Sequence, residues 1–254
     1  MIDLKGKKAL ITGGSRGIGR AIALTLSKAG CQVAINYFRN KKAVEETAEE
    51  IMSSRAEGEG SPLLLKANVG KPEDIVSMFE TLKKEWGSLD IVVSNAASGV
   101  LKPTMELTHH HWQWTLDINS YSLLALAQHA VPLMKNGGKI IGISSMGAFR
   151  AIPNYTLVGA SKAAMESVAR HLAIELAPKK INVNIISAGV VDTDALKHFP
   201  NREELLENSA KKTPAGRLIT PQDVASTALF LCSDLSEMIH GQTIIVDGGY
   251  AIVA

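Results

Sequence analysis

The chain has 254 residues, of which 46% are hydrophobic and 5% aromatic, and its formal net charge is +2. It is long enough for one large core or two modest domains, and neither its composition nor its charge indicates disorder. Lysine and arginine are scattered, so we expect no nucleic-acid partner, and no apolar run approaches the roughly 20 residues that cross a bilayer, so we expect no membrane insertion.

The start of the chain and its two cysteines suggest a location. Residues 1–8 lead directly into an apolar segment, which predicts no secretory leader. Cys31 and Cys232 lie far apart and have no paired spacing. We therefore expect a reduced, cytoplasmic protein.

Short apolar segments alternate with longer amphipathic ones along the whole chain. The apolar segments predict strands at residues 9–11, 33–37, 63–67, 91–94, 139–144, 181–186 and 243–246. The amphipathic segments predict helices at residues 17–29, 41–55, 72–86, 112–134, 155–176 and 221–231. This alternation predicts an α/β fold with a parallel sheet and helices on both faces, in three α/β/α layers. No linker divides the chain, so we expect one domain over residues 1–254, with an insertion at about residues 192–217 that closes over substrate as a lid.

The first predicted strand is followed at once by a glycine-rich turn and a helix. The turn contains Gly13, Ser15, Arg16, Gly17, Ile18 and Gly19. Glycines permit close approach of the backbone to a ligand, and the free amides at the start of a helix hold a pyrophosphate. This combination predicts a dinucleotide site; the alternative is a structural turn that binds no nucleotide.

The segment after the second predicted strand concerns the choice between NADH and NADPH. An NAD site usually places a carboxylate about 20 residues beyond the glycines, where it binds the ribose 2′-hydroxyl. Here Arg39 and Asn40 follow the strand, and no acid occurs before Glu45. Arg39 and Arg16 can hold a 2′-phosphate from two sides, because guanidinium groups present a planar set of donors. We therefore expect NADPH, with a merely solvated Arg39 as the alternative.

Tyr155 and Lys162 form a candidate catalytic pair with six residues between them. On an α-helix, the residues four and seven before a lysine both lie roughly on its face, and the nearer one is Val158, which cannot titrate. The usable hydroxyl would lie one turn further away, about 4.5 Å along the axis. This displacement predicts that the substrate is a double bond and not a ketone. The alternative is an ordinary aromatic at a helix start and a solvent-facing lysine.

Two other patterns resemble a metal site and a hydrolase nucleophile, but the sequence supports neither. Adjacent residues on a helix point in different directions, so His109, His110 and His111 cannot converge on one metal, and Thr108 before them is expected to be an N-cap. The sequence has no His-Glu-x-x-His motif, and we expect no metal site. Residues 142–146 lack the second glycine of a nucleophile elbow, which disfavours a serine hydrolase.

Several further motifs extend the pattern along the chain. They are Asn68-Val69, Asn95-Ala96-Ala97, Asn119, Ser145, the Tyr155 and Lys162 pair, Ser187-Ala188-Gly189 through Asp192-Thr193, and Asp247-Gly248-Gly249. Together with the glycine-rich turn, their order and spacing resemble the short-chain dehydrogenase/reductase family over essentially the whole chain. The resemblance implies a Rossmann-type, doubly wound fold and usually a homotetramer. It also implies contacts of Asn68 and Val69 with adenine, of Asn95 and Ala97 with the ribose and nicotinamide, and of Val191 and Thr193 with the carboxamide.

The position of the tyrosine resembles one branch of that family. Carbonyl-reducing members have their tyrosine at the position of Val158, whereas the enoyl-acyl-carrier-protein reductases have it earlier, at the position of Tyr155. Residues 150–155 and 187–189 also resemble this branch. Its NADH-using type has a second tyrosine where this chain has Ser145. Residues 95–101 and 192–203 resemble the NADPH-using type, enoyl-acyl-carrier-protein reductase III, which implies NADPH-dependent reduction of the trans-2 double bond of enoyl-acyl-carrier-protein thioesters in fatty acid synthesis.

The implied reaction assigns roles to the candidate residues. Hydride would reach the β carbon of a conjugated thioester while the Tyr155 hydroxyl hydrogen-bonds the enolate oxygen, two carbons away. Lys162 would bind the nicotinamide ribose and favour the ionised phenol. Asn119 would kink its helix and bind a water that links Lys162 to solvent, unless it is only a polar helix residue. Ser145 would contact substrate or only cap its turn, and the final proton donor is either Tyr155 or a water chain.

The acyl chain is expected to lie in an apolar slot between Ala97 to Leu101 and the insertion, with Leu196 in its wall. The basic residues of the insertion could steer an acidic carrier protein, although a solvated mixed-charge helix is an equal alternative. These residues are Lys197, Arg202, Lys211, Lys212 and Arg217. Two other functions stay open: reduction of a carbonyl, such as a 3-ketoacyl thioester, and sensing of NADPH without turnover.

Overall fold

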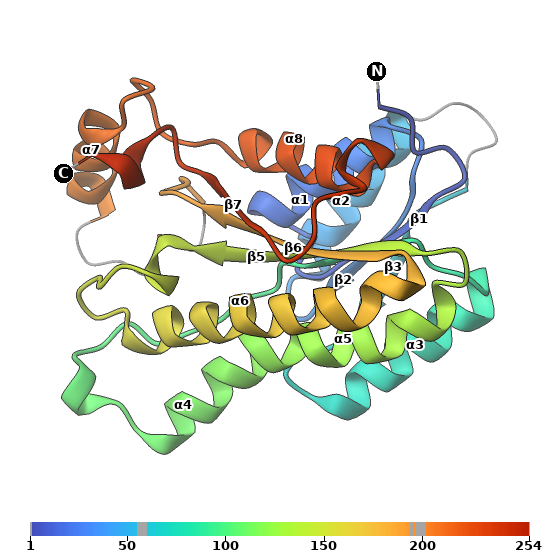
Figure 1. Cartoon of the computed structure of the whole chain (residues 1–254), viewed down its shortest axis with the longest axis horizontal. Helices are drawn as coiled ribbons and strands as arrows, with labels where there is room; N and C mark the ends of the chain where they lie inside the picture. The colour runs from blue at the N-terminus through green and yellow to red at the C-terminus, as the bar shows by residue number, and fades with distance from the viewer. Residues whose placement is uncertain (1, 55–59, 194–195, 197–201, 254) are drawn as a thin grey trace.

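Seven parallel strands form one sheet at the centre of the protein (Figure 1). The computed structural model describes residues 2–54, 60–193, 196 and 202–253. The strands are β1 (Lys8–Ile11), β2 (Gln32–Tyr37), β3 (Leu63–Lys66), β4 (Ile91–Ser94), β5 (Gly138–Ser145), β6 (Ile181–Ala188) and β7 (Thr243–Val246). Their runs of Val, Ile and Leu suit strands that are buried on both faces.

The strand order is β3-β2-β1-β4-β5-β6-β7, and every neighbouring pair is parallel. The chain moves outward from β1 to β3 and then crosses back to β4, on the other side of β1. Such a reversal leaves a crevice at the carboxyl ends of β1 and β4, where open α/β sheets bind their ligands. The predicted doubly wound parallel sheet is confirmed.

Helices cover both faces of the sheet (Figure 1). One layer contains α1 (Gly17–Lys28), α2 (Lys41–Ser53) and α8 (Pro221–Cys232), and the other contains α3 (Pro72–Trp86), α5 (Ser122–Ala130) and α6 (Thr156–Leu176). Neighbouring residues of β1 divide between the two cores, because side chains alternate along a strand. Leu10 is buried in the core of α3, α5 and α6, and Ile11 in the core of α1, α2 and α8. The predicted three layers are confirmed.

The long helix predicted at residues 112–134 is divided in the structure. It begins earlier, as α4 (His109–Leu116), and passes through a π-helical turn at Asp117–Tyr121 into α5. It ends in a 3₁₀ turn at Val131–Leu133, where Pro132 has no N–H to donate. The predicted helical segment is present, but the prediction of one continuous helix was wrong. π-Helical turns of this kind are frequent at functional sites.

Other predicted boundaries shift by a few residues. The helix expected at residues 155–176 begins at Thr156, so that Tyr155 precedes α6 as its N-cap residue. The helix expected at residues 41–55 ends at Ser53, and residue 55 lies outside the described residues. The insertion contains α7 (Arg202–Lys212), beyond the carboxyl end of β6 (Figure 1).

Two findings bear on the environment of the protein. None of the helices in the part of the chain that the structure describes combines the length and apolarity needed to span a bilayer. Cys31 and Cys232 are both buried thiols that form no disulfide.

Candidate active site

The glycine-rich turn after β1 is fastened to the end of β4. The hydroxyl of Thr12 accepts hydrogen bonds from the backbone N–H groups of Asn95 and Ala96, both at 3.0 Å. In return, the side-chain amide of Asn95 donates to the carbonyls of Thr12 (2.8 Å) and Gly13 (3.1 Å). Asn95, which we predicted to line the cofactor, therefore shapes the turn that would hold it.

Asn36 of β2 holds the same turn from the other side. Its side-chain oxygen accepts from the N–H of Gly13 at 3.3 Å, and its amide donates to the carbonyls of Leu65 (3.1 Å) and Ala67 (3.0 Å). We predicted no role for Asn36 in the sequence, although a polar residue near the end of an apolar strand is the signal that would have found it. The turn is thus fixed between β2 and β4, at the crevice of the sheet.

The glycines of the turn occupy positions that other residues would block. Gly13 and Gly17 have φ values of 62° and 55°, in the left-handed region that favours glycine. A β carbon on Gly19 would lie 2.4 Å from the carbonyl oxygen of Gly13. Helix α1 starts directly after Arg16 with no side-chain cap and no acidic residue in its first turn. Its first amides and the positive end of its dipole suit an anion such as pyrophosphate, so the turn fits a dinucleotide.

Ser15 and Ile18 connect the turn to the neighbouring helices, Ser15 through its backbone and Ile18 through its side chain. The carbonyl of Ser15 accepts a hydrogen bond from the Thr47 hydroxyl of α2 at 3.2 Å. Ile18 is partly buried against the core of α1, α2 and α8. Both residues therefore fix the shape of the turn, and their contacts with a cofactor stay predictions.

The two arginines expected at a 2′-phosphate, Arg16 and Arg39, are exposed. The Arg39 guanidinium carbon lies 5.4 Å from the centre of the Phe38 ring, a cation–π distance. Asn40 accepts a hydrogen bond from the N–H of Ala43 at 3.1 Å and caps α2. Asn40 thus has a structural role beside its expected contact with the cofactor.

Asn68 and Val69 follow β3, next to the carboxyl end of β2. The N–H of Asn68 donates to the Asp74 carboxylate at 2.7 Å, and its side-chain oxygen accepts from the N–H of Gly70 at 3.0 Å. Val69 is buried. These bonds fix a tight turn at the edge of the crevice, where we predicted the adenine.

The segment after β6 returns to the glycine-rich turn. Val191 is buried and forms a backbone bridge with Ile219. A β carbon on Gly17 would lie 3.4 Å from the γ-methyl carbon of Thr193. The residues predicted to hold the nicotinamide carboxamide therefore meet the turn predicted to hold the pyrophosphate in one crevice.

The predicted lid at residues 192–217 is described in part. Residues 194–195 and 197–201, with Lys197 among them, lie outside the described residues. Leu196 is partly buried, and its N–H donates to the carbonyl of Thr193 at 3.0 Å. Closure of this segment over substrate stays a prediction.

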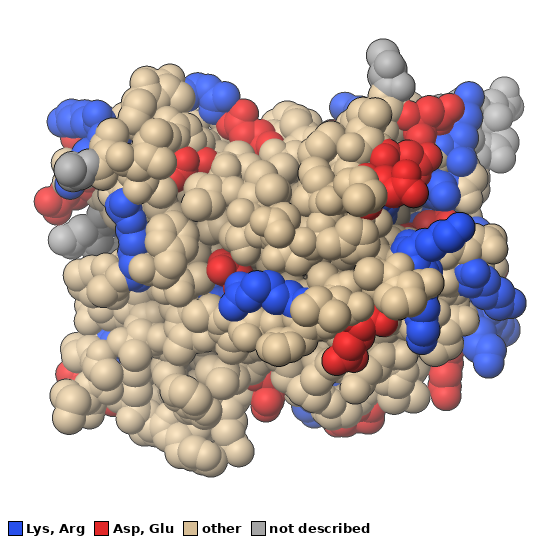
Figure 2. All heavy atoms as spheres, in the orientation of Figure 1, with Lys and Arg blue, Asp and Glu red and all other residues tan. Residues whose placement is uncertain are grey.

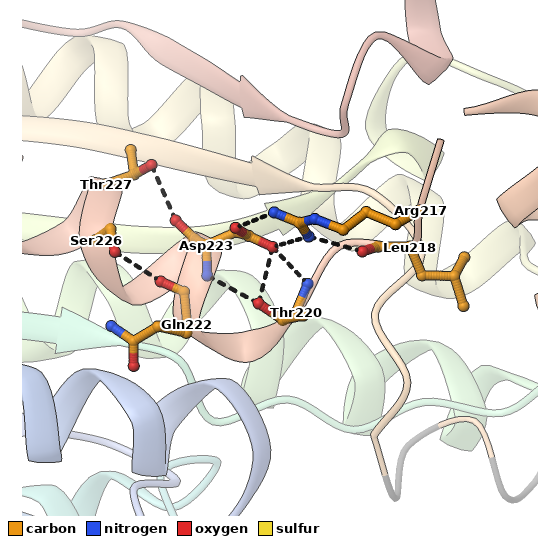
Figure 3. A network of polar contacts seen from close by, with 7 residues as sticks. All are labelled: Arg217, Leu218, Thr220, Gln222, Asp223, Ser226 and Thr227. Carbon is orange, nitrogen blue, oxygen red and sulfur yellow. Dashed lines mark hydrogen bonds and ion pairs between the residues drawn. The ribbon is translucent and has the colours of Figure 1, made fainter. Parts of the chain in front are cut away.

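A polar network fastens the end of the insertion to the start of α8 (Figure 3). Arg217 binds both carboxylate oxygens of Asp223, at 2.6 and 2.8 Å, and these hydrogen bonds hold the pKa of that carboxyl well below its usual range. Asp223 also accepts from the N–H of Thr220 at 2.8 Å, while the Thr220 hydroxyl accepts from the N–H of Asp223 at 3.2 Å, which completes a capping box. The insertion therefore rejoins the fold at a fixed point.

Three of the basic residues expected to steer a carrier protein have acidic partners. Arg202, Lys211 and Arg217 pair with Asp192, Glu207 and Asp223, at 2.6, 3.9 and 2.6 Å. A paired cation attracts a distant acidic protein less strongly than an unpaired one. This pairing favours the alternative of a solvated mixed-charge helix (Figure 2).

Tyr155 stands at the start of α6 and not within it. Asn154 before it has φ of 61°, a left-handed conformation that asparagine tolerates better than most residues. A β carbon on Gly147 would lie 2.5 Å from the Tyr155 ring, so the glycine makes room for the phenol. The Tyr155 hydroxyl lies 3.3 Å from the Ser145 hydroxyl. Tyr155 therefore precedes the helix as its N-cap residue, whereas our estimate of the displacement of its hydroxyl assumed that it lies within the helix.

Lys162 is 5% exposed and donates a hydrogen bond to the carbonyl of Ile143 at 2.7 Å. Burial lowers the pKa of Lys162 to about 8, and the Glu166 carboxylate opposes that shift. Burial raises the pKa of Tyr155, with the hydrogen bond from Ser145 opposing it. The solvent-facing alternative for Lys162 is wrong. This upward shift of the pKa of Tyr155 is opposite in direction to our expectation that Lys162 favours the ionised phenol.

Val158 is packed against the loop that follows β4. A β carbon on Gly99 would lie 2.3 Å from a methyl carbon of Val158. Val158, four residues before Lys162, therefore packs against this loop and offers no hydroxyl. The hydroxyl beside Ser145 comes from Tyr155 instead.

Asn119 lies in the π-helical turn and is fully buried. Its amide donates to the carbonyl of Ser98 (2.8 Å) and to the hydroxyl of Ser161 on α6 (2.9 Å), and its oxygen accepts from the N–H of Ser98 at 2.8 Å. The alternative of a polar residue facing solvent is wrong, because Asn119 joins the loop after β4 to α6. Its water link to Lys162 stays a prediction.

The loop of Ala97 to Leu101 lies beside the tyrosine. Ala97 is exposed and Leu101 is partly buried. The next residue, Lys102, donates its N–H to the carbonyl of Asn154 at 3.2 Å, directly before Tyr155. This connection supports a substrate position between the loop and the phenol.

The three adjacent histidines belong to the start of α4. Thr108 is the N-cap residue, as predicted, and accepts from the N–H of His111 at 3.3 Å while its own N–H donates to the His111 ring at 3.2 Å. Over residues 2–54, 60–193, 196 and 202–253, no group of three or more His, Cys, Asp or Glu side chains could hold a metal ion.

Comparison with known proteins connects this geometry to a family. The chain matches the family model described as enoyl-(acyl carrier protein) reductase over residues 13–251. A 1-cyclohexenylcarbonyl-CoA reductase of Streptomyces collinus is 40% identical over 97% of this chain and 87% of its own. An NADH-dependent enoyl-acyl-carrier-protein reductase of Aquifex aeolicus is 38% identical over 98% of this chain and 93% of its own. A hydroxynaphthalene reductase-like protein of Metarhizium robertsii is 37% identical over 97% of this chain and 96% of its own.

A solved structure extends the similarity to three dimensions. The enoyl-acyl carrier protein reductase of Bacillus cereus, in complex with NADP⁺ and indole naphthyridinone, superposes with a TM-score of 0.93. Its sequence is 31% identical, and the match covers 100% of both chains.

Proposed function

Since the chain belongs to the enoyl-(acyl carrier protein) reductases of the short-chain dehydrogenase/reductase family, we propose that it reduces the trans-2 double bond of enoyl thioesters carried on acyl carrier protein, with NADPH as cofactor. The observation that carries the proposal is the placement of the acidic hydroxyl. Val158 packs on Gly99, and the hydroxyl of Tyr155 lies beside Ser145 instead.

That placement suits a conjugated thioester better than a ketone. In a ketone, the carbon that accepts hydride also bears the oxygen that needs stabilisation. In a conjugated thioester, the β carbon accepts hydride and the carbonyl oxygen is two carbons away. A hydroxyl supplied by Tyr155, and not by the position four residues before Lys162, suits the more distant oxygen of the thioester.

The residues of the site have separate tasks in this reaction. A bound nicotinamide cofactor supplies the hydride. Tyr155 donates a hydrogen bond to the carbonyl oxygen as negative charge develops there. Lys162 places an ammonium charge near this oxygen and toward the cofactor ribose, and Ser145 orients the phenol.

NADPH is favoured by the charges at the end of β2. Arg39 and Arg16 are exposed at the crevice, and the chain has no acid from Tyr37 to Lys42. The structure of the Bacillus cereus relative contains NADP⁺, whereas the Aquifex aeolicus relative is NADH-dependent. Family membership alone therefore supports a nicotinamide cofactor, and the arginines support its phosphorylated form.

Acyl carrier protein is proposed as the carrier because the chain matches the model of the reductases named for it. The Streptomyces collinus relative is named for a coenzyme A thioester, which provides the competing carrier. Rates measured with crotonyl-acyl carrier protein and with crotonyl-coenzyme A would separate the two. A higher kcat/KM for the coenzyme A ester would contradict the carrier proposal.

A homotetramer and a reducing, cytoplasmic location complete the proposal. The outer strand β7 exposes Ile245, and α6 exposes Ile174, which is 76% accessible. Subunit contacts would cover such apolar surface, and two buried thiols agree with a reducing environment. Light scattering after gel filtration tests the tetramer.

The experiment that tests the reaction follows NADPH absorbance with crotonyl and acetoacetyl thioesters side by side. We expect oxidation of NADPH with the crotonyl substrate and formation of the butyryl thioester. Turnover of acetoacetyl thioesters alone would contradict the proposal and indicate carbonyl reduction. Binding of NADPH without turnover of either substrate would indicate a sensor.

A further inference from the structure

Three consecutive residues of β5 contact three different polar groups of the α6 segment. The carbonyl of Ile143 accepts from the Lys162 ammonium at 2.7 Å, and the hydroxyl of Ser145 lies 3.3 Å from that of Tyr155. Between them, the hydroxyl of Ser144 donates to the Glu166 carboxylate at 2.6 Å. The first and third contacts belong to the proposed reaction, and the second has no role in it so far.

Glu166 stands one helical turn after Lys162. Residues four apart on a helix are neighbours on its surface, so the carboxylate and the ammonium face the same side of α6. Lys162 is 5% exposed, and an ammonium in such a place is costly unless an opposite charge compensates it. The short bond from Ser144 holds Glu166 on the strand to which Lys162 is also bonded.

We propose that Glu166 is a positioning residue for the active site: its carboxylate, held by the hydroxyl of Ser144, keeps the buried Lys162 side chain in its charged ammonium form. The catalytic role of the Lys162 charge rests on the proposed function. The interaction between Glu166 and Lys162 does not, because it depends only on how α6 packs on β5.

The charges around Lys162 support this assignment. Burial lowers the pKa of Lys162 to about 8, and the Glu166 carboxylate is the group that raises it. Other described titratable groups on α6 and on the elements packed against it are at the start of the helix, are exposed, or contact residues other than Lys162. They are Tyr155 at the N-cap, His109, His110 and His111 of α4, Asp117 and Tyr121 of the π-helical turn, Arg170, His171 and Glu175 further along α6, Lys179 in the 3₁₀ turn after it, His129 of α5 stacked on Phe79, and Lys139 of β5 bonded to Asn182.

Removal of the carboxylate should therefore discharge Lys162 at a lower pH. A lysine loses its charge as the pH rises through its pKa. In Glu166→Gln the pKa of Lys162 should fall by about one unit, because removal of a neighbouring opposite charge typically lowers the pKa of a lysine by about that amount. At pH 8 the charged fraction would then fall about fivefold.

The test observes Lys162 directly, without substrate. The protein is produced with [ε-¹³C]lysine, the Lys162 signal is assigned by its loss in Lys162→Met, and its titration midpoint is followed by NMR. We expect a lower midpoint in Glu166→Gln and, through loss of the fixed carboxylate, also in Ser144→Ala. Glu175→Gln removes the same charge from an exposed site on the same helix and should leave the midpoint unchanged.

A second readout connects the midpoint to catalysis. The alkaline limb of the kcat/KM profile should move to lower pH in Glu166→Gln, with partial return in Glu166→Asp. An unchanged Lys162 midpoint in Glu166→Gln, or an equal shift in Glu175→Gln, would overturn the inference whatever the substrate proves to be. A shifted midpoint in a protein that reduces no enoyl thioester would leave the inference standing and sink the proposed function.

Discussion

A methyl carbon of Val158 fills the space beside Gly99, where an added β carbon would lie only 2.3 Å away. This contact joins the first turn of α6 to the loop after β4, which carries Ala97 and Leu101, the residues proposed to contact substrate. The position four residues before Lys162 is therefore occupied by packing, and the hydroxyl proposed to act on substrate is that of Tyr155.

We predict that Gly99→Ala distorts this loop and that Val158→Ala restores it. The added methyl group overpacks the contact, at a typical cost of about 1–3 kcal/mol, and should raise the KM for the enoyl substrate with a smaller effect on kcat. The double variant has room for the methyl group and should recover most of the KM. A double-mutant cycle measures this coupling, and strictly additive effects would show that the two residues do not interact.

The Tyr155 hydroxyl should matter for turnover and not for cofactor binding. Tyr155→Phe keeps the ring against Gly147 but removes the donor to the developing oxyanion. Loss of one such donor typically lowers kcat by about 10²–10³-fold. Stopped-flow kinetics and NADPH fluorescence titration measure the two properties. Tyr121→Phe, at an exposed tyrosine, is the matched control, and full activity of Tyr155→Phe would remove the phenol from the mechanism.

Arg39 should discriminate between the two cofactors. Hydrogen bonds to charged groups are worth about 1.5–3 kcal/mol, so Arg39→Ala should raise the KM for NADPH roughly 10- to 100-fold and leave that for NADH nearly unchanged. Lys42→Ala, which removes a neighbouring exposed charge on α2, is the control. Equal weakening of both cofactors would show that Arg39 does not bind a 2′-phosphate.

The order of strands and helices could be predicted because each strand is apolar on both faces. Leu10 and Ile11 illustrate this, since they enter opposite cores from adjacent positions. The glycine-rich turn was also visible in the sequence, because φ values such as those of Gly13 and Gly17 favour glycine over most other residue types.

The parts of the site that could not be predicted depend on contacts between distant segments. Ser144 and Glu166 are 22 residues apart and meet only because α6 packs on β5. Tyr155 carries no local signal that places it before the helix, apart from Asn154 in its left-handed conformation. The burial of Asn119 likewise follows from the π-helical turn and its partner Ser98, neither of which has a periodic pattern.

Asn119 should be important for stability. Asn119→Ala leaves the partly buried N–H and carbonyl of Ser98 without their partner, and water can satisfy these groups only in part. The free energy of unfolding should fall by roughly 1–3 kcal/mol in urea denaturation. Ser120→Ala is the adjacent control, because its buried hydroxyl has no hydrogen-bond partner among the described residues. Equal loss of stability in both variants would refute the role of the Asn119 amide.

The charge of Lys162 should make stability depend on pH in a particular direction. The pKa of Lys162 falls from 10.5 to about 8 on folding. Between these values the unfolded chain binds more protons at this site, so the free energy of unfolding should rise with pH from about 8 to 10.5. Below pH 8 the full cost of the buried charge is present, on the order of 3 kcal/mol.

The comparison is with Lys162→Met, because titration of all other groups is common to both proteins. Their difference in unfolding free energy, measured in urea at pH 7, 8, 9 and 10, should move in favour of the parent protein as the pH rises. A difference that stays constant across this range would mean that Lys162 keeps its ordinary pKa in the folded protein.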